Sequence, residues 1–273
     1  MTTSIHGGST VLPLGNVETT ALIPVAIKAS ETLRPNARIR DEAAVRIIKT
    51  LGVDTRPFDK FMSHEGVIAR TVMLDRMVKN YVHHEPNAVV VNLGAGFDNR
   101  FERVDNGTID WFDIDLPDSI AARQKVFAPR ERVTMIAADV CADTWVAQVQ
   151  AAVSRRKSVP LFLAEGLLMY FTMEEISRFL SILKNSFTHG TLFAEQNSPL
   201  LVKRQKYHDT VKHTKAVFKS GTTSGQELCA LCSGIRFVEE HSFHEEMKKH
   251  SLRGKFFAAL FPSMNNRWAT FEW

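Results

Sequence analysis

The sequence predicts an α/β protein whose sheet is mostly parallel and covered by helices on both faces. Short apolar stretches typical of strands alternate with longer stretches in which apolar residues recur every three or four positions, as in amphipathic helices. Parallel strands need a crossover between them, so this alternation favours a parallel sheet. The first strand runs into Gly94-Ala95-Gly96 and the second into Asp115, the layout of a nucleoside pocket at the carboxyl edge of such a sheet.

Apolar residues at helical spacing predict two helices before the first strand, over residues 41–51 and 58–82. Five strands and three connecting helices then alternate. The strands are expected at residues 88–93, 109–114, 133–137, 161–164 and 191–195, and the helices at 117–127, 142–155 and 173–186. Pro117 suits the first position of a helix, and Thr172 can cap the helix that follows it.

The chain after the fifth strand departs from this alternation. A further helix is predicted over residues 199–219, and two last strands, over residues 236–243 and 268–273, are expected to form a terminal antiparallel pair. The sheet then has seven strands. We expect a single domain made of a flexible tail (1–17), a helical cap (18–85), a core (86–197), an insertion with the sixth strand (198–264) and the last strand (265–273).

Composition excludes several classes of protein. The 273 residues are 44% hydrophobic, enough for one large core, and no apolar stretch approaches the ~20 residues that span a bilayer. The net charge of +4 is modest and its basic clusters, at 155–157 and 203–206, carry no interleaved aromatics, so no nucleic-acid partner is expected. Residues 1–11 lack signal-peptide features, and three cysteines are too few for a disulfide scaffold, which favours the cytoplasm. The lone C-x-x-C at Cys229 and Cys232 predicts no metal site.

The glycine turn and the acid after the second strand predict nucleoside binding. Gly94 and Gly96 let the backbone turn sharply and approach a ligand closely. Asp115 lies about 20 residues further on, where a carboxylate can accept hydrogen bonds from both ribose hydroxyls. A purely structural turn is the alternative meaning of two glycines alone.

The residues after the turn favour S-adenosylmethionine over NAD. A dinucleotide fingerprint needs a third glycine three residues after Gly96, and Asn99 stands there. Asp98 adds a negative charge that would repel a pyrophosphate but attract a sulfonium cation. The cofactor expected is therefore S-adenosylmethionine.

Three motifs carry a resemblance to a known family. The segments VNLGAGFD at 91–98, FDIDLP at 112–117 and LAEGLLMY at 163–170 together resemble the leucine carboxyl methyltransferase family, in particular its bacterial branch of tetracenomycin-type polyketide O-methyltransferases. The likeness runs from Glu18 to about Asn197. It implies a class I S-adenosylmethionine-dependent methyltransferase fold, which is Rossmann-like, and an O-methyl transfer.

Other candidate site residues stand at strand ends, where ligands of such sheets bind. Asp139 and the N–H of Val140 follow the third strand and can recognise adenine; the alternative for Asp139 is to cap the next helix. Glu165 ends the fourth strand near the expected methionine portion and should face a cation or donor. Tyr170 either faces the acceptor or packs. The cofactor site expected so far comprises Gly94, Ala95, Gly96, Asp98, Asp115, Leu116, Asp139, Val140 and Glu165.

Two cations are candidates for the methionyl carboxylate of the cofactor. Arg70 stands in an otherwise apolar helical run, where an unpaired guanidinium is costly and a carboxylate would relieve it. Lys28 is similarly framed by small and apolar residues. The family resemblance implies that an arginine and a lysine at these positions hold that carboxylate. The alternative is that both are snorkelling cations of amphipathic helices.

The function predicted is methyl transfer from S-adenosylmethionine to a hydroxyl or carboxylate oxygen of a small molecule, such as a polyketide-like metabolite. A carboxylate needs no general base and a hydroxyl does, but no residue is identified as that base. Acceptor choice is expected in residues 197–264, with Tyr207 and Phe218 as candidates. An NAD-dependent oxidoreductase and a non-catalytic nucleoside-binding sensor or scaffold stay open, and the oligomeric state is undetermined.

Overall fold

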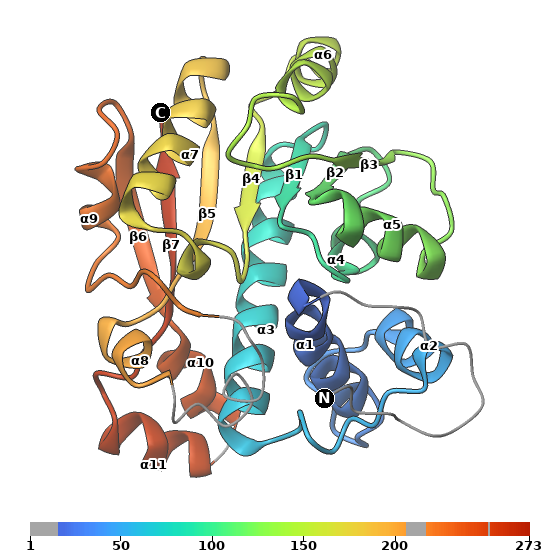
Figure 1. The fold of residues 1–273 in the computed structure, drawn as a ribbon, viewed down its shortest axis with the longest axis vertical. Helices are drawn as coiled ribbons and strands as arrows, with labels where there is room; N and C mark the ends of the chain where they lie inside the picture. The colour runs from blue at the N-terminus through green and yellow to red at the C-terminus, as the bar shows by residue number, and fades with distance from the viewer. Residues whose placement is uncertain (1–15, 206–216, 251) are drawn as a thin grey trace.

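A seven-stranded sheet forms the centre of the protein, in the order β3-β2-β1-β4-β5-β7-β6 (Figure 1). The computed structural model describes residues 16–205, 217–250 and 252–273. The strands are β1 Val89–Leu93, β2 Asp110–Asp115, β3 Val133–Ala137, β4 Leu161–Ala164, β5 Thr191–Gln196, β6 Arg236–Ser242 and β7 Arg267–Glu272. Strands β1 to β5 are parallel, and β7 is antiparallel to both β5 and β6. The predicted sheet and its antiparallel end are confirmed, with strand ends within one residue of those expected.

Helices cover both faces of the sheet and its carboxyl edge (Figure 1). Apolar residues of α6 and α7 pack on one face, and those of α3, α4 and α10 on the other. At the carboxyl edge, α1 and α2 lie below β1 to β3, whereas α8, α10 and α11 lie below the other end of the sheet. The helices are α1 Asn16–Thr32, α2 Glu42–Leu51, α3 Phe61–His84, α4 Arg100–Val104, α5 Pro117–Val126, α6 Val146–Arg156, α7 Met173–Ser186, α8 Pro199–Lys203, α9 Gln226–Cys229, α10 Phe243–His250 and α11 Leu252–Leu260, with a 3-10 turn η1 at Leu168–Tyr170.

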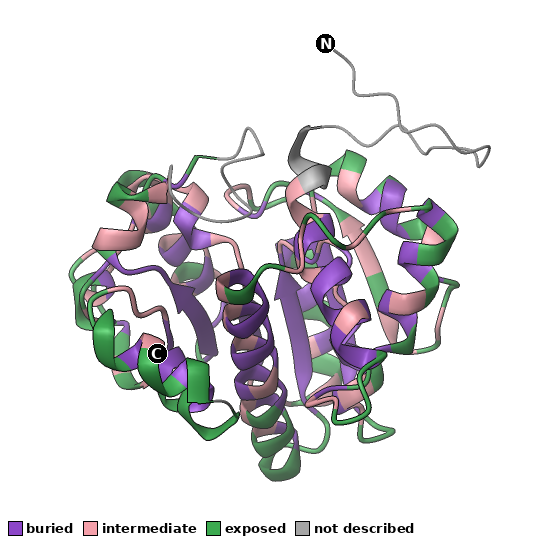
Figure 2. Cartoon of the chain, turned by 90° about the horizontal axis from the view of Figure 1, so that it is seen from below, coloured by how far each residue is buried: buried purple, intermediate pink, exposed green. Residues whose placement is uncertain are grey.

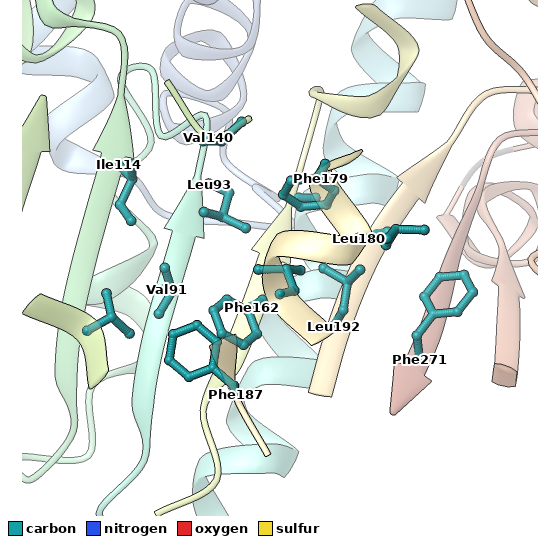
Figure 3. Packing of buried hydrophobic residues seen from close by; sticks show 14 of the residues in the cluster. Val91, Leu93, Ile114, Val140, Phe162, Phe179, Leu180, Phe187, Leu192 and Phe271 are labelled. Atoms are coloured by element: carbon teal, nitrogen blue, oxygen red, sulfur yellow. The ribbon is translucent and has the colours of Figure 1, made fainter. Parts of the chain in front are cut away.

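The core is densest around Phe162 of β4, which is fully buried. Its ring centroid lies 5.0 Å from that of Phe187, 5.8 Å from Trp273 and 6.4 Å from Trp145. Aliphatic side chains of the neighbouring strands surround this cluster (Figure 3). Strands β1, β4 and β5 are buried throughout and the two edge strands, β3 and β6, are partly exposed, while exposed residues gather on outer helices (Figure 2). Burial on both faces explains why the central strands are continuously apolar.

Local signals in the sequence start several helices where predicted. A capping box begins α7: the Thr172 hydroxyl accepts the N–H of Glu175 at 3.2 Å, and the Glu175 carboxylate accepts the N–H of Thr172 at 2.7 Å. Pro117 is the first residue of α5. The carboxylate of Asp41 caps α2 by accepting the N–H of Ala44 at 2.9 Å.

The helix predicted over residues 199–219 is wrong in length. It ends at Lys203, residues 206–216 lie outside the described part of the chain, and residues 217–220 are not helical. The N–H of Lys219 donates to the carbonyl of Met169 at 2.7 Å instead. Phe218 packs on Met169 and Tyr170 of η1. Its apolar side chain is therefore explained by this contact and not by an amphipathic helix.

Other differences concern helix starts and short helices. The helix after β3 begins at Val146 and not at 142, because turns occupy the residues between. The apolar spacing of the sequence does not predict five of the helices: α1, α4, α9, α10 and α11. In α1 an unbroken apolar run over residues 21–27 hides the helical spacing, and the other four helices have nine residues or fewer. The predicted tail over 1–17 lies almost wholly outside the described residues. No described helix is both long and apolar enough to span a membrane.

Phe162→Ala should lower the free energy of unfolding by about 3–5 kcal/mol, because the aromatic cluster cannot close over the space left. Urea unfolding measures this. Phe256→Ala is the control, since Phe256 is 67% exposed and its loss should leave stability nearly unchanged. A loss below about 1 kcal/mol for Phe162→Ala would show that the cluster repacks.

Candidate active site

A cavity of about 710 Å³ opens at the carboxyl edge of the sheet, in the range of small-molecule sites. Every residue predicted for the cofactor site lines it, and so does Tyr170. Turns after β1 to β4 supply most of the wall, while α1, α3 and η1 supply the rest. These residues are Lys28, Arg70, Gly94, Ala95, Gly96, Asp98, Asp115, Leu116, Asp139, Val140, Glu165 and Tyr170. The rule that such sheets place their polar strand ends together thus holds here.

The turn after β1 is held by the end of β2. Gly94 and Gly96 have φ angles of +70° and +48°, which other residues rarely adopt. A Cβ on Gly94 would also lie 2.9 Å from Leu167. The Asp115 carboxylate accepts the N–H of Gly96 through Oδ2 and that of Leu116 through Oδ1, both at 2.7 Å. Burial raises the pKa of Asp115, and these two hydrogen bonds oppose the rise.

Asp139 bonds to its own turn. Its Oδ1 accepts the N–H of Cys141 at 2.8 Å. Because α6 begins only at Val146, the alternative that Asp139 caps this helix is wrong. Its other oxygen, Oδ2, makes none of the hydrogen bonds of this turn. Val140 beside it is buried and faces the same cavity.

Asp98 is surrounded by cations, which corrects one premise of the sequence argument. Its carboxylate lies 2.9 Å from Lys28 Nζ, 2.8 Å from Arg100 Nη1 and 3.5 Å from Arg103 Nη2. Burial alone would raise the pKa of Asp98, but these three cations hold it well below its usual value. Its charge is therefore already compensated by the protein and is not free to select a sulfonium over a pyrophosphate.

Arg100 links Asp98 to Glu165. Its side chain is fully buried and contacts Asp75 at 2.7 Å, Asp98 at 2.8 Å and Glu165 at 2.7 Å. Glu165 thus faces a cation, as expected for a buried acid. Burial would raise its pKa, but Arg100 and Arg70 outweigh that effect and lower it. Arg103 extends the cluster by pairing with Asp75 at 2.6 Å and with Asp41 at 2.7 Å.

Arg70 is paired, which corrects the expectation that a ligand alone would neutralise it. Its Nε lies 2.7 Å from Glu165, and its Nη1 lies 3.1 Å from Glu195. The register Ala164↔Ala194 places these two acids side by side at the ends of β4 and β5. Burial raises the pKa of Glu195, and Arg70 opposes this. The Nη2 atom of Arg70 takes part in neither contact.

Several atoms of this cluster of charges are close to opposite charges yet not aligned for hydrogen bonds. Arg70 Nε, Arg100 Nη2 and Glu165 Oε2 are buried without a hydrogen-bond partner among the described residues. They retain donor and acceptor capacity that a polar ligand in the cavity can use.

Sequence reasoning missed the residues that complete this cluster: Asp41, Asp75, Arg100, Arg103 and Glu195. They come from α1–α2, α3, α4 and β5, and nothing in their local spacing marks them as partners. Only Arg100 carries a signal, because it stands directly after the glycine turn. No group of His, Cys, Asp or Glu suited to a metal occurs in the described ranges, and the three cysteines are free.

A second cavity, of about 150 Å³, adjoins the first. The two share five lining residues: Thr20, Pro24, Arg70, Gly166 and Tyr170. Tyr170 stacks obliquely on Phe218, with ring centroids 5.6 Å apart, and burial raises its pKa to about 12. Much of the remaining wall comes from the segment predicted to choose the acceptor, including Leu201, Phe243 and Met264. Tyr207 lies outside the described residues.

One family model matches more than half of the chain. Residues 21–184 match the leucine carboxyl methyltransferases. The chain is 26% identical, over 84% of its length and 84% of the relative's, to the tetracenomycin polyketide synthesis O-methyltransferase TcmP of Streptomyces glaucescens. It is 31% identical, over 57% of each chain, to a presumed S-adenosyl-L-methionine-dependent methyltransferase of Streptomyces coelicolor. The crystal structure of a presumed methyltransferase from Thermobifida fusca has the same fold, with a TM-score of 0.60, 13% identity and coverage of 92% and 93% of the two chains.

Asp98→Asn should lower the free energy of unfolding at pH 7 by about 3–5 kcal/mol, because it leaves three buried cations short of an anion. The pKa of Asp98 is lower in the folded than in the unfolded chain, so its stabilisation is complete above about pH 4 and is lost as the pH falls below that. The difference in the free energy of unfolding between wild type and Asp98→Asn should therefore become smaller below about pH 4.

Urea unfolding from pH 7 down to pH 3 measures this difference. Asp54→Asn is the matched control, because Asp54 pairs with Arg56 on the surface and its loss should leave stability unchanged. A difference between wild type and Asp98→Asn that stays constant at all pH values would contradict the assignment.

Proposed function

Because the chain belongs to the leucine carboxyl methyltransferase family, we propose that its larger cavity binds S-adenosylmethionine and its smaller cavity holds the acceptor. The protein is an S-adenosylmethionine-dependent methyltransferase of class I fold. None of the relatives named above supports the oxidoreductase alternative. What is proposed is which residues bind the cofactor and which oxygen receives the methyl group.

The residues of the larger cavity suit each part of S-adenosylmethionine. Asp115 is assigned to the ribose: each carboxylate oxygen accepts one backbone N–H, Ser119 is a further partner, and the carboxylate lines the cavity with capacity left for a hydroxyl. The glycine turn lets the backbone approach the nucleoside. Asp139 and Val140 are assigned to the adenine edge. Leu116, an apolar side chain that is 43% exposed on this wall, is assigned to the adenine face.

The methionyl end is assigned to the cluster of charges. The unaligned Glu165 Oε2 can accept from the α-amino group, and Arg70 can donate to the carboxylate through Nε and Nη2. Lys28 is assigned a supporting role, because Asp98 and Asp41 already hold its Nζ at 2.9 Å and 3.6 Å. The cofactor carries opposite charges at this end, so a cluster with both signs suits it.

The single observation that carries the acceptor assignment is that the two cavities adjoin at Tyr170, Gly166 and Thr20. When bound, the cofactor supplies a methyl group activated by its sulfonium. The residues of the junction then need to align the acceptor oxygen and exclude water, which is the larger part of catalysis in such a transfer. Tyr170 is assigned to the acceptor side of the junction.

The acceptor proposed is a small molecule that offers a hydroxyl or carboxylate oxygen. The relative from Streptomyces glaucescens is named for a polyketide pathway, which supports a polyketide-like acceptor here. We place the protein in the cytoplasm on account of its three free thiols, with no nucleic-acid or membrane partner. Incubating a small-molecule extract with labelled S-adenosylmethionine, followed by mass spectrometry, tests the proposal: no labelled product from any extract would contradict it.

Asp115→Ala should weaken binding of S-adenosylhomocysteine by about 1.5–3 kcal/mol for each ribose hydrogen bond lost to the charged carboxylate. Calorimetry on the folded variant measures this. Asp118→Ala, an exposed acid in the first turn of α5, is the control and should bind normally. Unchanged affinity in Asp115→Ala would remove Asp115 from the ribose site.

Arg70→Ala should abolish most of the preference for a cofactor that has its carboxylate. Wild type should bind S-adenosylhomocysteine about 10–100 times more tightly than its decarboxylated analogue, the value of one or two charged hydrogen bonds. Arg70→Lys should retain part of this preference, since it keeps the charge but not the planar fork.

Calorimetry with both ligands measures these preferences. Arg76→Ala, on the exposed face of the same helix, is the control. If Arg70→Ala discriminates between the two ligands as well as wild type does, the carboxylate belongs to Lys28 or to another group.

A further inference from the structure

The smaller cavity is built to hold an apolar ring. Its walls are mostly apolar side chains from α1, α3, η1, α8, α10 and α11 and from the loop before β7, among them Ile23, Met62, Val67, Met169, Phe218, Phe243, Met247, Phe257 and Met264. A cavity of about 150 Å³ is the size that accepts one benzene ring in a protein core. Shape and lining therefore limit the part of the acceptor that enters to about one ring.

Charge does not favour an ion in this cavity. Among the described lining residues, only Arg70 and Glu195 are a strong base and an acid, and they pair with each other at 3.1 Å. A second charge brought into the apolar part would lack a partner and would be costly. The part of the acceptor that enters is therefore uncharged.

Two buried polar atoms on this wall have no hydrogen-bond partner among the described residues: Thr20 Oγ1 and His244 Nε2. Thr20 lines both cavities, so it stands at their junction. His244 lines only the smaller cavity and is 5% exposed. Because an unpaired buried polar atom is unfavourable, a ligand group that pairs with it gains affinity.

The surroundings of His244 keep its ring in place and neutral. It follows directly after Phe243 at the start of α10, and its ring meets Phe257 edge-on with centroids 5.7 Å apart. Burial lowers the pKa of His244, against a smaller opposite effect of a hydrogen bond to the main chain of Met264. Met264 and Lys248 are the neighbours that act on its titration. A neutral imidazole offers one donor and one acceptor.

Resting on the proposed function, we propose that His244 determines acceptor specificity by hydrogen-bonding a second polar group on the ring. The oxygen that gains the methyl lies at the junction beside Thr20. The ring extends into the smaller cavity, and a hydroxyl or carbonyl on it meets His244 Nε2. The acceptor class is a ring compound with two oxygen functions: an uncharged one that enters the smaller cavity, and a hydroxyl or carboxylate oxygen at the junction that is methylated. His244 is a positioning residue and does not touch the reacting atoms.

The test compares ring compounds that differ by one hydroxyl. Phenol and the three dihydroxybenzenes form one series, and benzoate and the three hydroxybenzoates form the other, so that either acceptor oxygen can lie at the junction. Binding is measured by calorimetry on protein saturated with S-adenosylhomocysteine, and methylation of the same compounds is measured by mass spectrometry with S-adenosylmethionine.

In wild type, one hydroxylated isomer should bind about tenfold more tightly than its parent ring, the value of one buried hydrogen bond. His244→Phe should lose that gain and bind the parent ring at least as well as wild type does. His244→Gln, whose amide can still form a hydrogen bond, should retain part of the gain. His241→Phe, an exposed histidine three residues earlier, is the control and should behave as wild type.

The outcomes separate the two levels of the proposal. If wild type does not bind S-adenosylhomocysteine, the proposed function itself is overturned. Three other outcomes, each with normal S-adenosylhomocysteine binding, would overturn the role of His244 and leave the proposed function intact. In the first, wild type binds no ring compound; in the second, it binds all isomers equally; in the third, His244→Phe shows the same preference as wild type.

Discussion

The structure of the site depends on the pairing of its buried charges. Asp98, Arg100 and Glu165 are removed from water, and each would be strongly destabilising alone. They are tolerated because Asp98 has three cations nearby, Glu165 has two, and Arg100 has three acids. Since the partners come from α1, α2, α3 and α4 and from the ends of β4 and β5, the charges also join the helical cap to the sheet. Part of the wall of the larger cavity is thus made of groups that the fold itself requires.

The carboxyl edge of the parallel sheet explains why these groups meet. Neighbouring strands end there together, and the turns that follow them carry Asp98, Asp115, Asp139 and Glu165 within one cavity. Asp115 has two structural bonds in that edge, to Gly96 and Leu116, so the residue assigned to the ribose also shapes the glycine turn. A binding residue that also supports its neighbours is positioned before the ligand arrives, which reduces the entropy that binding costs.

The two cavities are lined largely by two different parts of the chain. Residues of the larger cavity lie mostly in the region that matches the family, 21–184, whereas much of the smaller cavity comes from residues 195–266. The walls of the two cavities therefore come largely from different parts of the chain. His244, Phe257 and Met264 belong to the second part, and they give the acceptor cavity features that family membership does not specify.

The sequence by itself determined the sheet, its strand ends and most of the polar residues that line the larger cavity. These follow from local physics: apolar runs become buried strands, Gly94 and Gly96 adopt positive φ angles, and polar residues at the ends of parallel strands share one edge. Tertiary structure alone decided how the charges pair. Asp98 and Arg70 were expected to await a ligand, but Lys28, Arg100 and Glu195, up to 125 residues away in sequence, already pair with them. Residue spacing along a chain does not encode such contacts, because they arise only when separate helices and strands pack together; the same is true of the unpaired nitrogen of His244 and the cavity that it faces.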